Sequence, residues 1–284
     1  MTTPTPTISE IRQYLSGFSQ EGGENWQEEN QRYLDAHAHR FHESLRFIPS
    51  GNQGERLLEL GAAPYFTTLL LKKYFPYSLS LSNAVIPGEP PESSINLTKP
   101  AIGEEHAFEY QTFNVELDRY PYPDHSVDTV LCWEIIEHLA LDPTHMLMEI
   151  HRVLKPGGKL LITTPNVLVL RNILALLKNR QNIYHPYSGY GVYGRHNREW
   201  TLDELTQILT GCGYSIRAAE IVDTYAHRGY SKILKRFFPS LRDMLVVLAQ
   251  AENNAPPYYP ENLYTSLPKN YLSENPIPSH LQDS

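Results

Sequence analysis

The order of apolar and helical segments in this sequence predicts an α/β fold with a doubly wound, mostly parallel sheet. Short apolar runs alternate with helical patterns along most of the chain, and strands that alternate with helices pair mainly in parallel. A thin turn of small residues, Gly61-Ala-Ala63, follows the first run, and a Lys155-Pro-Gly-Gly158 turn precedes a later one. Ligands of such sheets bind above the carboxyl ends of the strands.

The N-terminal part is expected to be helical and the sheet to follow it. Residues 1–25 are polar, with at most a short helix over 8–18, and an amphipathic helix over 26–47 ends at Pro49-Ser-Gly51. Residues 84–105 are rich in Pro, Gly and Glu and predict a loop without a core of its own. Seven strands are expected, the last two as an antiparallel edge pair, over 56–60, 77–83, 108–114, 129–133, 159–163, 214–222 and 243–248. Between them we expect helices on both faces, over 67–74, 144–153 and 201–209.

An insertion at 167–200 precedes the edge pair. A helix is predicted over 167–179, and the Gly-rich stretch 184–194 then carries several aromatic rings. Glycines permit movement and rings supply contact area, so we interpret 167–200 as a lid over an acceptor site, with a surface loop as the alternative. Thr201 and Glu204 form the sequence signature of a capping box at the start of the next helix.

These boundaries predict one main domain with two flanking segments. We expect an N-terminal segment at 1–25, an α/β domain at 26–252 that includes the lid, and a Pro-rich tail or linker at 253–284 without periodicity. The tail wraps the domain or leads to a further domain or partner, and the sequence favours neither.

Composition restricts the classes of partner. Hydrophobic residues make up 41% of the chain, and no apolar run reaches the roughly 20 residues of a membrane span, so no membrane partner is expected. The N-terminus lacks the basic and apolar regions of a secretory signal, which predicts a cytoplasmic protein. A formal net charge of -8 disfavours nucleic acid. Cys132 and Cys212 both lie in apolar segments and are expected to be buried thiols.

Three motifs together resemble the class I S-adenosylmethionine-dependent methyltransferases, which have a Rossmann-like fold. They are the Glu59-Leu-Gly-Ala-Ala63 turn, Pro121-Tyr-Pro-Asp124 before the fourth strand, and Leu154-Lys-Pro-Gly-Gly158 before the fifth. The resemblance covers residues 30–250. It implies an enzyme with S-adenosylmethionine as its cofactor.

The resemblance also implies where that cofactor is held. The cofactor's amino acid end faces Glu59 and the Gly61, Ala62 and Ala63 turn, and its ammonium group is bound by the main chain at Cys132 and Trp133. Family members usually have an acid for the ribose at the end of the second strand, whereas this chain offers Ser82 and Asn83. Asn83 is the favoured ribose contact. Asn114 and Val115 follow the third strand, where the family holds the adenine.

An acidic and histidine cluster follows the fourth strand. Glu134, Glu137 and His138 stand at i, i+3 and i+4, so a helical turn projects them on one face. Their composition fits either a divalent metal site or a general base, for which His138 is the best candidate. The same run, with His196 before Glu199-Trp-Thr201, is similar to metal-dependent small-RNA 2′-O-methyltransferases. It also resembles ubiquinone-pathway O-methyltransferases, so it does not specify RNA.

These observations favour an O-methyltransferase that acts on a small or medium-sized molecule, namely a secondary metabolite of a biosynthetic pathway, a sugar or a peptide terminus. One alternative is an enzyme that methylates RNA or protein, with Glu134, Glu137, His138 and His196 as the ligands of a metal ion. The other is a scaffold that binds the cofactor but has lost activity, since the turn at Gly61 lacks two glycines and the strand-end acid is missing.

Overall fold

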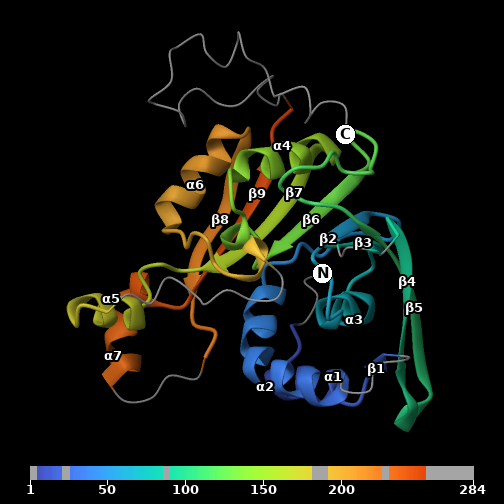
Figure 1. Cartoon of the computed structure of the whole chain (residues 1–284), viewed down its shortest axis with the longest axis horizontal. Coiled ribbons are helices and arrows are strands. Elements are labelled where there is room, and N and C mark those ends of the chain that lie inside the picture. Colours follow the sequence, from blue (N-terminus) through green and yellow to red (C-terminus); the bar gives the residue numbers. More distant parts are fainter. Residues whose placement is uncertain are drawn as a thin grey trace. The chain divides into compact units, whose positions relative to one another are not determined.

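The computed structural model describes residues 5–20, 26–85, 88, 90–180, 191–225 and 230–253, without the side chains of Trp26, Gln27, Glu29 and Tyr230 (Figure 1). The chain divides into two compact units. The first comprises Met1–Phe113 and Asp223–Ala226, and the second comprises Asn114–Val222 and His227–Ser284.

The first unit contains a five-stranded sheet in the order β1-β4-β5-β3-β2. Its strands β2, β3 and β5 are parallel neighbours, and β4 and β1 extend the sheet antiparallel. The strands are β1 (Ser19–Gln20), β2 (Arg56–Leu60), β3 (Ser78–Asn83), β4 (Glu92–Lys99) and β5 (Glu104–Thr112). The helices are α1 (Ile8–Leu15), α2 (Trp26–Leu45), α3 (Phe66–Tyr74) and the 3-10 turn η1 (Pro100–Ile102).

The prediction that residues 84–105 form a loop is wrong. Strands β4 and β5 form a long hairpin through η1, visible as the teal pair in Figure 1. On β4, Ile95 and Leu97 are buried while Asn96 between them is exposed. Such alternation identifies a half-buried strand, but only two apolar residues carry it here, and the Pro, Gly and Glu content conceals it.

The second unit contains four strands in the order β6-β7-β9-β8. Strands β6 and β7 are parallel, and β9 runs antiparallel to both β7 and β8. The strands are β6 (Val127–Trp133), β7 (Leu154–Pro165), β8 (Tyr214–Val222) and β9 (Met244–Ala251). The helices are α4 (Pro143–Val153), α5 (Leu170–Leu177), α6 (Leu202–Gly211) and α7 (Tyr230–Phe237). The 3-10 turns are η2 (Ile136–His138), η3 (Val192–Gly194) and η4 (Pro239–Leu241).

The predicted α/β class is confirmed, with parallel strands between helices and antiparallel strands at the end. The described residues form nine strands instead of seven, because β1 and β4 were not expected. Strand β8 has the predicted bounds, and Thr201 and Glu204 form the predicted capping box. Helix α5 is shorter than the predicted 167–179. Most of the aromatic stretch 184–194 of the predicted lid, and the predicted tail from residue 254, lie outside the described residues.

Both units have buried cores along their central strands. Leu57 and Leu58 of β2 and Leu160 and Leu161 of β7 have no exposed surface. Cys132 and Cys212 are buried, free thiols, as expected. Within the described part of the chain, no helix combines the length and the apolar character needed to cross a membrane.

Candidate functional site

The turn after β2 is held open by its own backbone. Gly61 has a φ of +65°, which glycine adopts at little cost, and Tyr65 at the start of α3 has a φ of +69°. The Ala62 N–H donates to the Ser82 carbonyl at 2.9 Å, and the Ala63 N–H donates to Asn83 Oδ1 at 3.0 Å. The structure therefore brings the predicted turn and the predicted end of the second strand together.

Asn83 uses both ends of its side-chain amide within this turn. Its Oδ1 accepts from Ala63, and its Nδ2 donates to the Tyr65 hydroxyl at 2.7 Å. Ser82 has a buried hydroxyl that makes no hydrogen bond within the described residues. Asn83 therefore shapes the turn in this structure, and its contact with a ribose stays a prediction.

Glu59 lies near the end of β2 and is only 4% exposed. The Thr68 hydroxyl donates to its Oε2 at 2.7 Å. Burial raises the pKa of the Glu59 carboxyl to about 8, and the hydrogen bond from Thr68 opposes this only in part. Because burial disfavours the charged form of Glu59, a cationic ligand such as an ammonium group would stabilise that form, so the site is suited to such a ligand.

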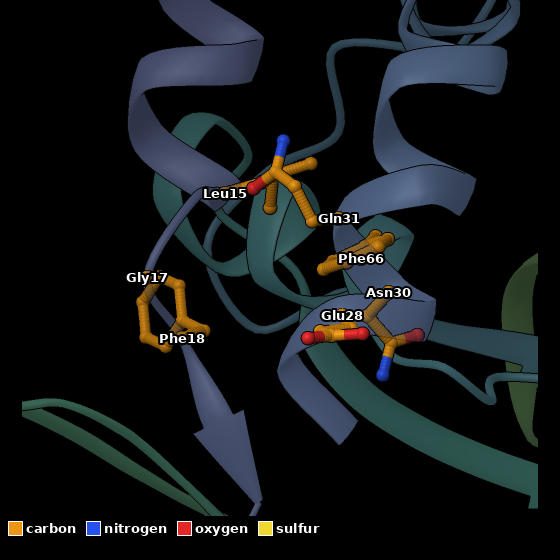
Figure 2. Close-up of a pocket in the computed structure, with 7 residues that line it drawn as sticks. All are labelled: Leu15, Gly17, Phe18, Glu28, Asn30, Gln31 and Phe66. Atoms are coloured by element: carbon orange, nitrogen blue, oxygen red, sulfur yellow. The ribbon is translucent and has the colours of Figure 1, made fainter. Parts of the chain in front are cut away.

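A cavity of about 310 Å³ lies in the first unit, among α1, the turn after it, α2 and the start of α3 (Figure 2). Leu15, Phe18 and Phe66 supply its apolar lining, while Asn30 and Glu28 supply an amide and a carboxylate. Its mixture of apolar and polar groups fits a small organic molecule with a few hydrogen-bonding atoms.

In the second unit, Asn114 and Val115 stand at the start of a fixed loop. Asn114 accepts the Glu116 N–H at its Oδ1, at 2.9 Å, and donates from Nδ2 to the Tyr193 hydroxyl at 3.1 Å. The Val115 carbonyl accepts from the buried Tyr120 hydroxyl at 3.1 Å. The predicted adenine pair is thus linked through Tyr193 to η3, which lies in the segment predicted to be a lid.

Cys132 and Trp133 end the buried strand β6. The Cys132 side chain is fully buried and contacts Met146, at 3.9 Å between the sulfurs, so only its main chain is available to a ligand. The Trp133 indole N–H is buried and makes no hydrogen bond among the residues that the structure describes.

Glu134 turns the chain out of β6. It has a φ of +55°, which is uncommon for a residue other than glycine and recurs at functional sites. Its N–H donates to the Thr163 carbonyl at 3.0 Å, and its Oε1 accepts from the Thr163 hydroxyl at 2.9 Å. Glu134 is therefore fixed to the end of β7.

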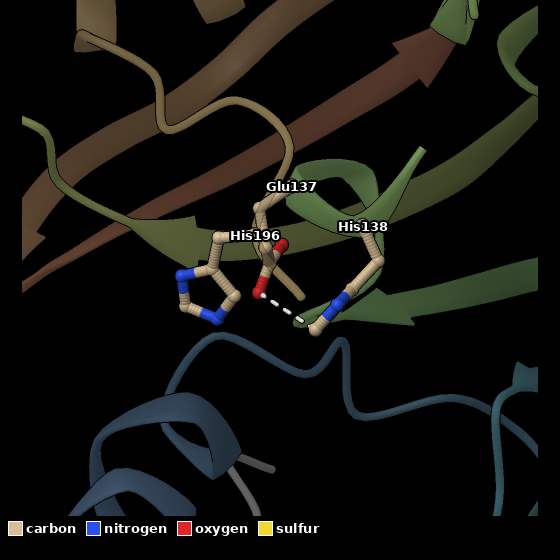
Figure 3. Close-up of side chains that lie close together, drawn as sticks. All are labelled: Glu137, His138 and His196. Carbon is tan, nitrogen blue, oxygen red and sulfur yellow. Dashed lines mark ion pairs between the residues drawn. The ribbon is translucent and has the colours of Figure 1, made fainter. Parts of the chain in front are cut away.

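Three of the four predicted catalytic residues converge, and Figure 3 shows them facing one another. Ligand atoms of Glu137, His138 and His196 all lie within 4.8 Å of one another, a group to which Glu134 does not belong. Glu137 and His138 come from η2 and His196 from the segment after η3. The Asn197 N–H donates to the Glu137 carbonyl at 2.7 Å, and this bond joins the two segments.

The hydrogen bonds of the two histidines fix their tautomers. His138 Nδ1 lies 3.0 Å from the Arg195 carbonyl, and His196 Nδ1 lies 3.1 Å from Glu199 Oε1. Both partners accept hydrogen bonds, so each Nδ1 carries a proton, and the neutral form of each ring has its lone pair at Nε2. The rings meet edge to face, with their centroids 4.9 Å apart.

The surroundings of these groups favour a neutral His138. Burial lowers its pKa below the ordinary value, and the neighbouring His196 lowers it further. Glu137 is fully buried, its Oε2 accepts from the Thr164 hydroxyl at 2.9 Å, and its Oε1 lies 3.8 Å from His138 Nε2. A carboxylate and two imidazole lone pairs fit a first-row divalent ion, and the Glu199 contact is of the kind that orients metal-ligating histidines.

Sequence reasoning missed the residues that hold this group in place. Near the end of β7, the Thr164 hydroxyl donates to Glu137 and the Thr163 hydroxyl to the preceding Glu134, while Asn172 of α5 donates to Glu199 Oε2 at 2.9 Å. The Thr163-Thr164 pair at the carboxyl end of a predicted strand was a usable signal. Asn172 had none, since its partner lies 27 residues away.

Comparisons with known proteins agree with the predicted fold and family. A family model described as a methyltransferase domain matches residues 26–219. A probable S-adenosylmethionine-dependent methyltransferase of Mycolicibacterium smegmatis is 34% identical over 100 residues, which are 35% of this chain and 33% of that protein. The matched segment thus spans about a third of such curated relatives.

Two further matches extend over most of the chain. The 27-O-demethylrifamycin SV methyltransferase of Amycolatopsis mediterranei is 26% identical over 249 residues, 84% of either protein. A chain from the solved complex between the Haloferax volcanii Trm112 methyltransferase activator and a methyltransferase superposes with a TM-score of 0.55. It is 16% identical and covers 80% of this chain and 95% of that chain, a likeness of fold.

Proposed function

This chain belongs to the class I S-adenosylmethionine-dependent methyltransferases, and we propose that it methylates an oxygen atom of a small or medium-sized acceptor, with His138 as the base. The observation that carries the proposal is the hydrogen bond from His138 Nδ1 to the Arg195 carbonyl, which leaves Nε2 as an acceptor. The similarity to a 27-O-demethylrifamycin SV methyltransferase over most of both chains supports an oxygen acceptor.

The proposed reaction needs little from the protein beyond positioning and proton uptake. The acceptor hydroxyl oxygen forms a bond to the methyl carbon while the bond from sulfur to that carbon breaks, and the products are a methyl ether and S-adenosylhomocysteine. The hydroxyl proton goes to His138 Nε2. A lowered pKa keeps His138 neutral and ready to accept that proton at pH 7.

The test replaces His138 by Asn. The Asn amide retains a donor for the Arg195 carbonyl but has no counterpart of Nε2, so the loop stays in place while the base is removed. We expect turnover, measured as S-adenosylhomocysteine released with fractions of a cell extract as acceptor, to fall on the order of 10²- to 10⁴-fold. Cofactor affinity is expected to stay unchanged.

His125→Asn is the matched control. His125 is exposed and has a φ of +54°, a conformation that Asn tolerates, so this variant is expected to keep wild-type turnover. Equal turnover of His138→Asn and the wild type would contradict the base. Loss of the acceptor on nuclease treatment of the extract would favour the alternative in which RNA is methylated.

A metal-assisted reaction is the second candidate, favoured by the convergence of Glu137, His138 and His196. A divalent ion held by these three residues would act as a Lewis acid on the acceptor oxygen and lower its pKa. We expect His196→Asn to reduce the metal content of the purified protein, measured by mass spectrometry, if this candidate holds. Full activity after chelation would contradict the metal-assisted reaction, and His138 as a metal-free base would then be the remaining candidate.

A further inference from the structure

Helix α5 of the second unit buries a polar residue and exposes apolar ones, the reverse of an ordinary surface helix. Of its eight residues only Asn172 is buried, held by bonds to the Val167 carbonyl and Glu199. Leu174, Leu176 and Leu177 are instead exposed, Leu177 at 79%. A surface helix normally directs such residues toward the core, so this apolar face suits a partner outside the described chain.

Helix α7 shows the same arrangement, with a buried polar residue and exposed apolar ones. Its Lys235 is 3% exposed and forms a 2.7 Å ion pair with Asp243, which is 6% exposed at its side chain. Ile233, Leu234 and Phe237 are exposed, Phe237 at 72%, and Phe238 after the helix is exposed at 55%. The buried residue is again the polar one.

Hydrogen bonds join the segment before α5 to the segment after α7. Asn166, just before α5, donates from Nδ2 to the carbonyls of Ser240 and Arg242, just after α7, at 2.7 Å each. Figure 1 draws α5 and α7 together at its lower left. We call the exposed residues of 168–180 and 232–238 the α5–α7 surface.

The charge of these segments contrasts with that of the whole chain. Segments 166–198 and 224–242 contain five Lys or Arg residues each and no Asp or Glu, although the chain holds 24 basic and 32 acidic residues. On the α5–α7 surface, five exposed cations form no ion pair within the described residues, namely Arg171, Lys178, Arg180, Lys232 and Arg236. An acid-free, basic and apolar surface complements a negatively charged, partly apolar partner.

We propose that the α5–α7 surface docks on an anionic lipid bilayer. Leu and Phe side chains beside Lys and Arg are the pattern of helices that lie in the membrane interface, where the apolar groups enter the acyl boundary and the cations meet the headgroups. Helices of eight residues are about 12 Å long and lie on a bilayer instead of crossing it. Nucleic acid would use the cations and leave the exposed Leu and Phe without a role.

The test is flotation of the full-length protein with vesicles of phosphatidylcholine, alone or mixed with phosphatidylglycerol. We expect binding to the mixed vesicles, weaker binding to the neutral ones and a loss of binding as salt rises. The double variant Leu177→Ser/Phe237→Ser removes the apolar contacts, and Lys232→Glu/Arg236→Glu reverses the charge. Each is expected to lower the partition coefficient on the order of tenfold or more.

Matched controls change residues that are not part of this surface. Leu141→Ser removes a leucine that is 75% exposed, and Arg32→Glu reverses a cation whose side chain is 82% exposed. Both are expected to bind vesicles like the wild type. Equal binding to neutral and anionic vesicles, or binding that survives Leu177→Ser/Phe237→Ser, would overturn the proposal.

Two other occupants give distinct results. A second copy of the chain would appear in light scattering as a dimer that Phe237→Ser disperses, without vesicle binding. RNA would bind in the absence of vesicles and would tolerate Leu177→Ser/Phe237→Ser while failing with Lys232→Glu/Arg236→Glu. Either result overturns the lipid proposal, and neither depends on methyl transfer, so the proposed function is tested separately.

Discussion

Asn83 stands where the family resemblance predicts a ribose contact, and in the structure its amide holds the turn between β2 and α3. Asn83→Ala removes both bonds, and we expect the dissociation constant for S-adenosylhomocysteine to rise several-fold. Asn83→Asp is the informative partner, because a carboxylate still accepts from the Ala63 N–H and from the Tyr65 hydroxyl. It also offers a charge-assisted bond to a ribose hydroxyl.

Calorimetric titration of both variants with S-adenosylhomocysteine separates the two roles of Asn83. Asp is expected to bind at least as tightly as the wild type, since the turn and the ribose contact both survive. If Asn83→Ala binds as the wild type does, position 83 belongs to neither the site nor its support.

Glu59 makes the stability of the cofactor-free protein depend on pH. Its pKa rises from the ordinary 4.5 to about 8 on folding, so the folded state binds the proton more tightly than the unfolded state. This contribution to stability is fully present below pH 4.5 and is lost as pH rises toward 8 and beyond. Glu59→Gln lacks this dependence, and we expect its free energy of unfolding to exceed that of the wild type at pH 8.5, by a few kcal/mol at most.

Urea denaturation at pH 5 and pH 8.5, without cofactor, measures this difference. The advantage of Glu59→Gln should shrink at pH 5, where the wild-type carboxyl is protonated. An advantage of the same size at both pH values would mean that ionisation of Glu59 is not its cause. Glu59→Gln is also expected to weaken cofactor binding, because it removes the charge proposed to face the ammonium.

At the scale of elements, local signals predicted what depends on neighbours in the sequence. The Thr201 and Glu204 box marks the start of α6 because both residues act within one turn. The hairpin of β4 and β5 was missed because its strands depend on pairing with each other and with β3, and their own residues are mostly polar.

The candidate site divides in the same way. Glu134, Glu137 and His138 were identified from one short run, and His196 from its resemblance to a family motif. The contacts from Asn172 to Glu199 and from Thr164 to Glu137 join residues 27 apart. Such contacts follow from the packing of whole elements, so no local pattern reveals them.

The ion pair of Lys235 and Asp243 fastens α7 to the start of β9 and is nearly inaccessible to water. Lys235→Met removes the cation of this buried pair, and we expect a loss of about 3–5 kcal/mol in the free energy of unfolding. Replacing both residues, as Lys235→Met/Asp243→Leu, is expected to recover most of that loss, because both charges of the buried pair are then removed. Urea denaturation measures both; wild-type stability of the single variant would show that the pair is solvated.

At the scale of the whole molecule, the net charge of -8 is a sum that hides an uneven distribution. The sequence expectation of neither membrane nor nucleic acid partner depended on that sum and on the absence of a long apolar run. The docking proposal departs from this expectation for a physical reason. Electrostatic attraction to a bilayer depends on charges within about a Debye length of the surface, roughly 8–10 Å, and not on the sum over the chain.

Binding of S-adenosylhomocysteine, the product formed from the cofactor, should stabilise the folded protein. A ligand that binds only the folded state adds about 2.7 kcal/mol to the free energy of unfolding when its free concentration is 100 times its dissociation constant. At roughly 2–4 °C per kcal/mol for a chain of this size, we expect S-adenosylhomocysteine to raise the unfolding temperature by about 5–10 °C. Differential scanning fluorimetry over a range of ligand concentrations measures the shift.

Comparing variants in this assay separates cofactor binding from methyl transfer. His138→Asn should keep the full shift while losing turnover, because its change affects proton uptake and not the cofactor. Asn83→Ala should show a smaller shift at the same ligand concentration, because its affinity is lower. A shift in the wild type without any S-adenosylhomocysteine formed from S-adenosylmethionine and extract fractions would favour the inactive scaffold. No shift at millimolar ligand would contradict cofactor binding itself and, with it, the proposed function.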